Sequence, residues 1–294
     1  MTVIFKYDQL SLISRMSHDR KVAVVTGSSS GIGYETSIAL ARSGIFTYAT
    51  MRNLQKATNL ESIKEKEKLP LRTLQLDVTD DASVNNAIQT IISESGRIDV
   101  LVNNAGYGLV GAFEDLSMDE IRSQFETNLF GVIRTMQSVL PIMRKQKFGI
   151  LLNISSGAGR FGYPSGSAYV STKFALEGLS ESIAYELDQF GIKVILVEPG
   201  VIRTNFDSGM VVAKRSQDAS SPYCNMTQKM DAVFRQLLHN SSPPSLVADV
   251  VSQAVKSENP NLRYLAGKDV EQWVDQKKKM SDTEFFNMMK QSFQ

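Results

Sequence analysis

The chain has 294 residues, of which 42% are hydrophobic and 21% charged, an ordinary composition for a folded protein with one large domain or two modest ones. Lysine and arginine number 32 and aspartate and glutamate 31, so there is no basic excess of the kind that indicates nucleic-acid binding. The single cysteine, Cys224, excludes an internal disulfide framework, and it has no cysteine or histidine neighbour that would indicate a metal site.

The first 19 residues have neither the long apolar core nor the cleavage pattern of a secretory signal. We interpret them as a tail outside the folded domain. No stretch offers the ~18 consecutive apolar residues of a membrane-spanning helix, and a lone cysteine favours a reducing compartment. We therefore expect a cytoplasmic protein with a single domain over residues 20–294.

From residue 21 onward, short apolar runs alternate with helical stretches. The predicted strands cover residues 21–27, 45–52, 72–80, 98–106, 149–156 and 192–200. The predicted helices between them cover residues 31–44, 81–96, 117–146 and about 167–190. Strands that are nearly continuous apolar runs are typical of a parallel sheet covered on both faces. We therefore predict a doubly wound, mostly parallel α/β fold with right-handed crossover connections.

A glycine-rich turn, TGSSSGIG at residues 26–33, joins the first predicted strand to the first helix. Gly27 would allow a tight turn, Gly31 would let the backbone approach a pyrophosphate, and Gly33 would permit close packing of the helix on the strand. The helix N-terminus offers free N–H donors and a partial positive charge to phosphates. The turn therefore indicates a dinucleotide site, although a purely structural strand–helix turn could carry the same residues.

The same turn also fits a different enzyme class. Residues 27–31 match G-x-S-x-G, the turn that carries the nucleophile of an α/β-hydrolase, which would make Ser29 the nucleophile and Asp231 and His239 its partners. Such a turn normally follows several strands that help to build the oxyanion hole, and only a short tail precedes this one. The hydrolase is therefore the remote alternative.

Tyr169 and Lys173 lie one helical turn apart in SAYVSTKFALEG (residues 167–178), so they share a face of the predicted helix. A free tyrosine has a pKa of ~10, and a nearby cation favours its phenolate. The pair is either an ordinary surface pair or an acid tuned for proton transfer.

Four motifs follow one another along the chain: TGSSSGIG (26–33), NNAG (103–106), Tyr169-x-x-x-Lys173 and EPG (198–200). In this order and at these separations, they resemble the classical short-chain dehydrogenase/reductase family over about residues 21–204. The stretch YVSTKFALEGLSES is further similar to the branch that contains 17β-hydroxysteroid and retinol dehydrogenases. The resemblance implies a Rossmann fold, a nicotinamide cofactor and an oxidoreductase that acts on alcohols or carbonyls.

The resemblance also implies the catalytic residues. Tyr169 would be the general acid (the base in the reverse direction), and Lys173 would favour its phenolate and bind the nicotinamide ribose. Counting thirteen residues back from Tyr169 gives Ser156, rather than the adjacent Ser155, as the residue that holds the substrate oxygen. Asn128, in ETNLFG, matches the residue that connects the lysine to water. Together these residues favour a tuned acid over a surface pair.

A larger set of residues is implied to bind the cofactor. Besides Tyr169 and Lys173, the set comprises Gly27, Ser28, Ser30, Gly31, Ile32, Gly33, Arg52, Asp77, Val78, Asn104, Ala105, Gly106, Pro199, Gly200, Ile202 and Thr204. Asp77 and Val78 would border the adenine, although Asp77 could instead cap the following helix. Asn104 would face the adenosine ribose, and Ile202 and Thr204 would face the nicotinamide carboxamide.

The end of the second predicted strand, YATMRN, bears on the choice between NADP and NAD. An acidic residue there binds the ribose 2′-hydroxyl of NAD, whereas an arginine accepts the 2′-phosphate of NADP. The position offers Met51 and Arg52 and no carboxylate, and an arginine can bind phosphate with a bidentate fork. We predict NADP(H), although Ser30 stands where many NADP-using relatives carry a second basic residue. Arg52 could alternatively be an exposed charge at the strand end.

Beyond Thr204 no further motif appears. Residues 205–240 are rich in methionine and other apolar residues, which adapt to irregular apolar ligands or pack into an ordinary core. By resemblance they form a substrate lid, and a C-terminal extension of about residues 258–294 would close the pocket or contact a neighbouring subunit.

We expect an apolar alcohol or ketone as substrate and a homodimer or homotetramer. A 3-oxoacyl-carrier reductase of the same family is the nearest alternative. A non-catalytic NADP(H)-binding regulator is a third reading, which the full catalytic set disfavours.

Overall fold

Within the described part of the chain, seven strands form one parallel sheet in the order β3-β2-β1-β4-β6-β7-β9. The computed structural model describes residues 20–204 and 210–292, so the predicted tail 1–19 lies outside it. The strands are β1 (Val22–Val25), β2 (Phe46–Met51), β3 (Leu71–Gln75), β4 (Val100–Asn103), β6 (Gly149–Ile154), β7 (Ile192–Pro199) and β9 (Arg263–Ala266). The prediction of a doubly wound parallel sheet is confirmed.

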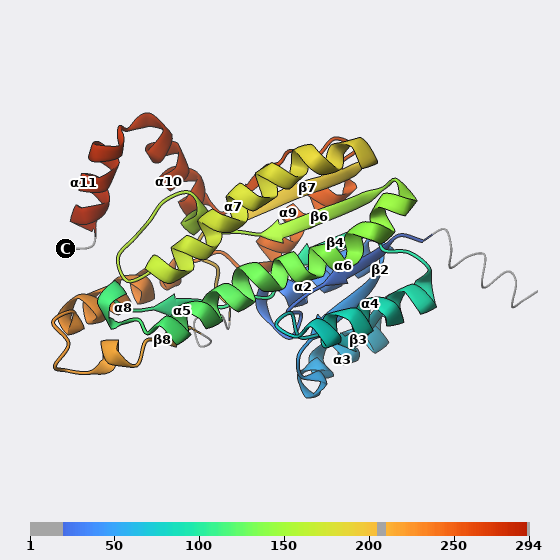
Figure 1. Cartoon of the computed structure of the whole chain (residues 1–294), viewed down its shortest axis with the longest axis horizontal. Helices are drawn as coiled ribbons and strands as arrows, with labels where there is room; N and C mark the ends of the chain where they lie inside the picture. The colour runs from blue at the N-terminus through green and yellow to red at the C-terminus, as the bar shows by residue number, and fades with distance from the viewer. Residues whose placement is uncertain (1–19, 205–209, 293–294) are drawn as a thin grey trace, which may run out of the picture.

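Helices cover both faces of this sheet. One face packs against α4 (Asp81–Ser95), α6 (Gly131–Gln146) and α7 (Ser167–Leu187), and the other against α2 (Gly31–Arg42), α3 (Thr58–Glu67) and α9 (Pro244–Lys256). Figure 1 shows α6 and α7 in front of the sheet and α9 behind it. None of the helices in the described residues is both long and apolar enough to span a membrane.

The sequence pattern of each strand follows its place in the sheet. Every residue of the inner strands β1, β4 and β6 is buried, which explains their uninterrupted apolar runs. The edge strands β3 and β9 are only partly buried. As a result, the prediction for β3 ran past Gln75 into the following turn, and β9 (RYLA) was not predicted at all.

The order of the strands reverses between β1 and β4, which lie side by side in the middle of the sheet. In open α/β sheets the crevice beyond the carboxyl ends of the strands at such a point is where ligands bind. The glycine turn follows β1, and the NNAG and EPG motifs lie at the ends of β4 and β7. Tyr169 and Lys173 lie in α7, the helix that follows β6, so the topology brings the four motifs to one edge of the sheet.

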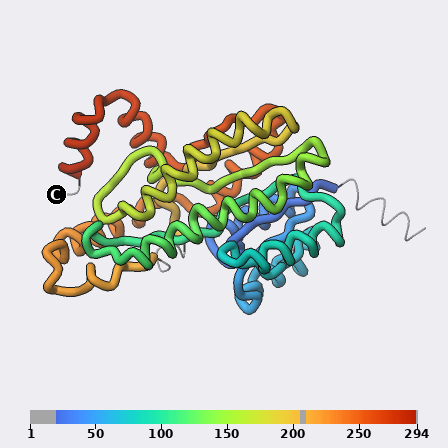
Figure 2. The backbone as a smooth tube through the Cα atoms, viewed as in Figure 1, coloured from blue at the N-terminus to red at the C-terminus, as the bar shows by residue number. Residues whose placement is uncertain are grey.

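The chain beyond β7 contributes α9 and β9 to the body of the fold and further helices to one end of the molecule. These helices are α8 (Cys224–His239), α10 (Lys268–Lys279) and α11 (Asp282–Ser292), and Figure 2 shows their orange and red segments at the end opposite residue 20. A short strand β8 (Val211–Val212) pairs in parallel with β5 (Leu109–Val110). The buried carboxylate of Asp115 fastens the same segment, accepting hydrogen bonds from the hydroxyls of Ser216 (3.2 Å) and Ser221 (2.7 Å).

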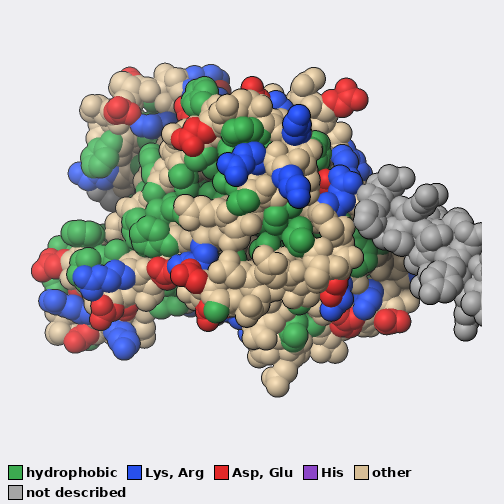
Figure 3. All heavy atoms as spheres, turned by 45° about the vertical axis from the view of Figure 1, so that its right-hand side comes forward, with side chains coloured by type: hydrophobic (Ala, Val, Ile, Leu, Met, Phe, Trp, Pro, Cys, Tyr) green, Lys and Arg blue, Asp and Glu red, His purple; other side chains and the backbone are tan. Residues whose placement is uncertain are grey.

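The surface carries both signs of charge. Figure 3 shows basic and acidic side chains scattered among apolar ones over one face of the molecule. This distribution agrees with the near balance of 32 basic and 31 acidic residues.

Candidate active site

The glycine turn between β1 and α2 packs directly against the end of β4. Gly27 and Gly31 have positive φ angles, +69° and +60°, which residues with a Cβ rarely adopt. A Cβ at Gly27 would lie 2.8 Å from the Cα of Ala105, and a Cβ at Gly33 would lie 2.5 Å from the carbonyl oxygen of Gly27. Gly33 is therefore needed for packing of the helix on the turn, as its spacing predicted.

We expect Gly33→Ala to destabilise the protein by about 1–3 kcal/mol, because the added methyl group meets backbone atoms that cannot move aside. Urea unfolding followed by circular dichroism measures this change. Gly178→Ala is the matched control, since an added Cβ on the exposed Gly178 would meet no atom of the described residues within 4 Å apart from its own helix, and alanine favours a helix. Equal stability of the two variants would contradict the packing role of Gly33.

Hydrogen bonds hold the glycine turn in place. The buried hydroxyl of Thr26 accepts from the backbone N–H groups of Asn104 and Ala105, each at 3.0 Å. The side-chain amide of Asn104 donates to the carbonyls of Thr26 (2.9 Å) and Gly27 (3.1 Å). Asn104 thus braces the turn, in addition to bordering the cavity described below. Thr26 was missed because a threonine at a strand end has no distinctive signal.

One predicted cofactor contact needs correction. Ser28 is buried, its hydroxyl donates to the carbonyl of Val25 (2.9 Å), and its backbone N–H donates to Thr50 (2.9 Å). Ser28 therefore faces the protein interior, and its neighbour Ser29 lines the cavity instead. Ser30 precedes α2, its side chain does not cap that helix, and it lines the cavity.

A cavity of about 1780 Å³ opens beyond the carboxyl ends of the strands. Every predicted catalytic and cofactor-binding residue lines it except Ser28 and Gly33. The lining residues that sequence reasoning missed include Lys56, Tyr107, Arg122, Phe161, Tyr163 and Gln276. Most of these lie in loops or on partly exposed helix faces, where no periodic pattern reveals them.

Tyr169, Lys173 and Ser156 converge in the middle of the cavity wall. Ser156 precedes a 3₁₀ turn (Gly157–Gly159), where its hydroxyl accepts from the N–H of Ala158 (3.1 Å) and forms a hydrogen bond with Tyr169. Lys173 is only 7% exposed, and its Nζ donates to the carbonyl of Ile154 (2.8 Å) and lies 5.7 Å from the centre of the Tyr169 ring. Ser155 also lines the cavity, but its buried hydroxyl has no hydrogen-bond partner among the described residues, so the geometry favours Ser156 as the partner of Tyr169.

The protein surroundings shift both titrating groups. Burial raises the pKa of Tyr169 to about 12, and the hydrogen bond with Ser156 opposes that rise. Burial lowers the pKa of Lys173 to about 8, and the charge of Glu177 opposes that fall. Burial is thus the largest influence on the Tyr169 pKa, and the lowering of that pKa by Lys173 stays a prediction.

Asn128 lies in a π-helical turn. The predicted helix 117–146 consists of α5 (Met118–Phe125), a π-helical segment (Glu126–Phe130) and α6. The buried side chain of Asn128 clamps the backbone of Tyr107, accepting from its N–H (3.1 Å) and donating to its carbonyl (2.9 Å). Its amide is thus committed to Tyr107, and a link from Asn128 to Lys173 stays a prediction. Wide turns of this kind occur frequently at functional sites.

At the far end of the cavity, Arg52 follows β2 and is exposed. Burial raises the pKa of Tyr107, and the positive charge of Arg52 opposes that rise. Lys56, in the 3₁₀ turn Leu54–Ala57, lines the same part of the cavity and supplies a second cation there.

Asp77 accepts from the N–H (3.0 Å) and hydroxyl (2.8 Å) of Thr79, whereas Asp80 caps α4. The capping alternative for Asp77 is therefore wrong.

The segment after β7 borders the other side of the glycine turn. A Cβ on Gly31 would lie 3.1 Å from the Cβ of Thr204. The Asp269 carboxylate of α10 accepts from the N–H of Val201 (2.7 Å), and Gly200 leaves room for that carboxylate. Ile202 forms an isolated bridge with Ser242. The chain after β7 is thus held from two sides.

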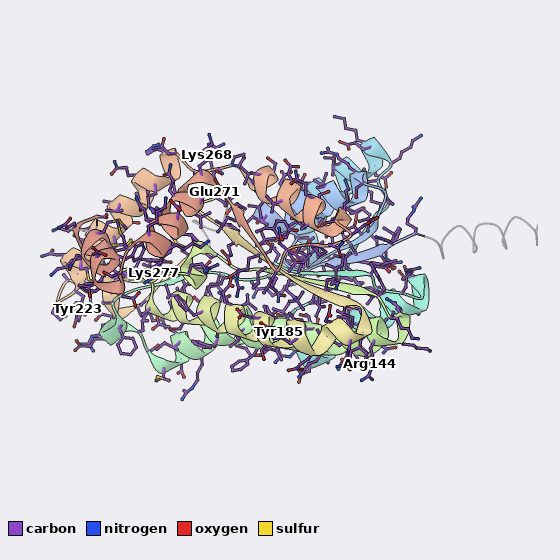
Figure 4. All side chains as sticks on the ribbon, turned by 90° about the horizontal axis from the view of Figure 1, so that it is seen from above. Arg144, Tyr185, Tyr223, Lys268, Glu271 and Lys277 are labelled. Carbon is purple, nitrogen blue, oxygen red and sulfur yellow. The ribbon has the colours of Figure 1, made fainter. Side chains whose placement is uncertain are left out.

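Apolar side chains of the distal segments close the outer part of the cavity. They are Met210, Val211, Met230, Val233, Phe234 and Leu237 from the predicted lid and Trp273, Met288 and Met289 from α10 and α11. Phe161 packs against the C-terminal helices, with its ring centre 5.7 Å from that of Trp273. Figure 4 shows Lys268, Glu271 and Lys277 of α10 at the same end of the molecule as Tyr223 of the lid segment.

The residues of the hydrolase alternative are not brought together. Asp231 is exposed on α8 and pairs with Arg235 (2.9 Å), and in the described residues no hydrogen bond joins it to His239 or joins either residue to Ser29. A catalytic triad requires its histidine between the acid and the nucleophile. Ser29 therefore has no triad in this fold.

The cavity fits a dinucleotide. The glycine turn leaves a cradle that a Cβ at Gly31 would partly fill, and the first turn of α2 contains no acidic side chain that would repel phosphate. The basic residues Arg52 and Lys56 lie at one end of the cavity, and Ser156, Tyr169 and Lys173 lie along its wall.

Comparison with known proteins agrees with this geometry. The family model for the short chain dehydrogenases matches residues 21–214. The chain is 40% identical over 256 residues to the uncharacterized oxidoreductase YusZ of Bacillus subtilis, covering 86% of this chain and 91% of YusZ. It is 35% identical to a 3-ketodihydrosphingosine reductase of Bacteroides thetaiotaomicron (84% and 88% covered) and 36% identical to retinol dehydrogenase 8 of Bos taurus (84% and 82%).

Solved structures show the same fold. A short-chain dehydrogenase from Streptomyces avermitilis superposes with a TM-score of 0.80 at 34% identity, covering 93% of this chain and 97% of its own. A metagenomic short-chain oxidoreductase in complex with NADP superposes with a TM-score of 0.68 at 26% identity (85% and 97% covered). A nicotinamide cofactor is thus supported. The chain belongs to the short-chain dehydrogenase/reductase family of oxidoreductases.

Proposed function

We propose that the protein is an NADP(H)-dependent oxidoreductase that interconverts an alcohol and a carbonyl on a largely apolar substrate, with Tyr169 as general acid and base. The observation that carries this proposal is the hydrogen-bonded pair of Ser156 and Tyr169 beside the buried Lys173, in the cavity that the glycine turn also lines. A reacting carbonyl needs a proton donor at its oxygen, and this group of side chains provides one.

Each side chain has a distinct task. The bound nicotinamide would supply or accept the hydride at the substrate carbon. Tyr169, protonated at neutral pH because of its raised pKa of about 12, donates the proton to the substrate oxygen. Ser156 orients that oxygen through its hydroxyl. Lys173, anchored on the carbonyl of Ile154, places a positive charge near the phenol that loses its proton and would contact the ribose.

The preference for NADP rests on two cations. Arg52 and Lys56 line the end of the cavity at which β2 finishes, and Met51 stands where NAD-binding proteins carry an acidic residue. Position 30 is a serine and offers no second basic group. Lys56, in the 3₁₀ turn after β2, lines the cavity and would supply one. A 2′-phosphate would pair with both.

An apolar substrate is supported by the outer wall of the cavity. Methionine, phenylalanine and tryptophan side chains from the lid and the C-terminal extension surround it. Two relatives are named for a retinol and for a ketodihydrosphingosine, both of which are long apolar molecules with an alcohol or keto group. We propose that residues 210–240 form the lid and residues 258–292 the outer wall of the substrate site.

We also propose a cytoplasmic homodimer or homotetramer. Phe130 of the π-helical segment and Phe174 of α7 are 48% and 46% exposed. Large exposed apolar side chains on neighbouring elements are a common feature of subunit interfaces. The single cysteine is consistent with a reducing compartment.

A turnover screen tests the proposed function. Ketones and alcohols of increasing apolar size are offered with NADPH or NADP⁺, and with NADH or NAD⁺ in parallel, while absorbance of the reduced nicotinamide is followed. We expect activity that rises with the length of the apolar part and is at least about tenfold higher with NADP(H). Hydrolysis of esters without any change in nicotinamide absorbance would refute the oxidoreductase.

We expect Trp273→Ala to raise KM for the largest apolar substrates about tenfold while leaving kcat nearly unchanged, since it removes apolar contact area that binds ground state and transition state alike. Tyr185→Ala is the matched control, because this side chain is exposed on α7 away from the cavity. If small and large substrates lose affinity equally, the C-terminal extension does not form the substrate wall.

A further inference from the structure

A cluster of charged side chains, two of them buried carboxylates, includes a residue of α7 one helical turn from Lys173. Arg263 of β9 donates to Glu177 (2.9 Å) and Glu181 (2.6 Å) of α7 and lies 3.5 Å from Glu198 of β7. Arg160 donates to Glu198 at 3.0 Å. The side chain of Glu198 is fully buried, so the cluster extends into the protein core. Neither the glycine turn nor the proposed proton transfer accounts for it.

Glu177 connects this cluster to the active site. It follows Lys173 by one turn of α7, so the two side chains share the helix face that carries Tyr169. Both are almost completely buried, with 6% of Glu177 and 7% of Lys173 exposed. In a site from which water is excluded, a carboxylate one turn away acts on an ammonium group far more strongly than it does at the surface.

One oxygen of Glu177 is not engaged by the arginine. Oε2 accepts from Arg263, whereas Oε1 is buried and has no hydrogen-bond partner within residues 20–204 and 210–292. The hydroxyl of Ser155 is likewise buried without a partner there, and a Cβ on Gly159 would lie within 2.9 Å of it and 3.3 Å of Oε1. The negative charge of Glu177 is thus only partly compensated by its neighbours.

Burial distinguishes the carboxylates of the cluster. Glu177 and Glu198 are almost completely buried, whereas the side chain of Glu181 is half exposed and its charge is screened by solvent. The Glu177 carboxylate, with one oxygen that has no hydrogen-bond partner among the described residues, therefore acts on Lys173 in a buried setting. A buried unpaired charge is costly, so this carboxylate stabilises the protonated form of the lysine.

We propose that Glu177 is a positioning residue that holds Lys173 in its ammonium form, so that the charge cluster behind α7 maintains the positive charge beside Tyr169. The catalytic consequence rests on the function proposed above, whereas the effect of Glu177 on Lys173 is a property of the folded chain. The hydroxyl of Ser155, the neighbour of Ser156, lies with Glu177 beside Gly159.

Groups from several elements of the fold surround Lys173. Tyr169 and Glu177 face it from its own helix, and the carbonyl of Ile154 and the hydroxyls of Ser155 and Ser156 face it from β6 and the turn that follows. The more distant charged and polar groups are Asn128 of the π-helical segment, Arg160, Glu198 of β7 and Arg263 of β9. Among the acidic groups, the Glu177 carboxylate is the one whose charge raises the pKa of Lys173, against the burial that lowers it to about 8.

Nuclear magnetic resonance of the cofactor-free protein tests the proposal without any assay of turnover. In protein labelled on lysine Cε and Nζ, the Lys173 signal is assigned by its loss in Lys173→Arg, and its titration midpoint is measured. We expect a midpoint near 8 in the wild type and a lower midpoint in Glu177→Gln. Glu177→Asp, which keeps the charge, should restore most of the difference.

Glu181→Gln is the matched control. Glu181 contacts the same Arg263 from the same helix, but 48% of its side chain is exposed and it lies one turn farther from Lys173. We expect this variant to leave the Lys173 midpoint unchanged. An identical midpoint in wild type, Glu177→Gln and Glu181→Gln would overturn the proposal and reduce Glu177 to an ion-pair partner of Arg263. Thermal unfolding verifies that each variant is folded. If Glu177→Gln does not fold, the Lys173 titration midpoint of Glu177→Asp is compared with that of the wild type instead.

Kinetics then separates the two proposals. The alkaline decline of kcat/KM for carbonyl reduction should begin at lower pH in Glu177→Gln, giving a loss of about threefold or more at pH 8 but less than about twofold at pH 6. A merely structural role would lower activity equally at both pH values. If the wild type turns over no carbonyl or alcohol, the proposed function fails, and the titration of Lys173 still decides the role of Glu177.

Discussion

Tyr169→Phe is expected to lower kcat about 10²–10⁴-fold while the Kd for NADPH stays within about twofold of the wild type. Phenylalanine keeps the ring, which packs beside Lys173, and removes only the hydroxyl that bonds to Ser156. The proton of the reaction then has no donor within reach of the substrate oxygen. Stopped-flow reduction of a ketone measures the loss, and quenching or enhancement of NADPH fluorescence measures the affinity.

The direction of the pH dependence follows from the same residue. Because burial raises the Tyr169 pKa to about 12, the phenol is protonated throughout the neutral range and competent to donate in carbonyl reduction. Alcohol oxidation requires the phenolate, so its rate should rise as pH increases toward that value. Tyr185→Phe serves as the control, since this exposed tyrosine lies outside the cavity. Full activity of Tyr169→Phe would remove the proposed acid.

The second large effect concerns the cofactor. Arg52→Ala should lower the ratio of kcat/KM for NADPH over NADH by about 10–100-fold, since a charge-assisted hydrogen bond to phosphate contributes ~1.5–3 kcal/mol. Adding Met51→Asp should carry the preference past unity toward NADH, because a carboxylate at this strand end repels the 2′-phosphate and accepts from the ribose hydroxyl. Steady-state kinetics with both cofactors and one good substrate measures the ratio.

Arg144→Ala is the matched control for the loss of an arginine. Arg144 lies in the last turn of α6, at the other end of the molecule from Lys277 and the lid (Figure 4). We expect it to leave the cofactor ratio unchanged. If Arg52→Ala leaves the ratio for NADPH over NADH as unchanged as Arg144→Ala does, Lys56 or another group binds the 2′-phosphate. The prediction made from the end of β2 is then wrong.

Much of the fold and the centre of the site could be predicted because their signals are local. The buried strands are uninterrupted apolar runs, and Tyr169 and Lys173 need only one helix to share a face. Edge strand β9 escaped prediction because its burial is partial and its four residues lack a run of apolar side chains. Which serine of the glycine turn faces inward depends on turn geometry, so Ser28 and Ser29 could not be distinguished by spacing alone.

The charge cluster could not be anticipated for a different reason. Arg160, Glu177, Glu198 and Arg263 come from separate elements that the sheet topology brings together. Each of them alone has the character of an ordinary surface charge in the sequence. The same holds for the outer wall of the cavity, where Trp273 and Met289 arrive from helices whose sequence periodicity reveals an apolar face without revealing what it covers.

The bond between Asp269 and the N–H of Val201 has a consequence for engineering the specificity of this protein. Asp269 lies in the first turn of α10, and Gly267, two residues earlier, adopts a φ of +132°. This bond, together with the packing of apolar side chains of α10 and α11 on Phe161, holds the C-terminal helices against the rest of the protein. We expect chimeras that exchange residues 270–292 and retain residues 267–269 to keep the nucleotide-binding half of the protein intact. The boundary after Asp269 is therefore a suitable junction for exchanging substrate selectivity.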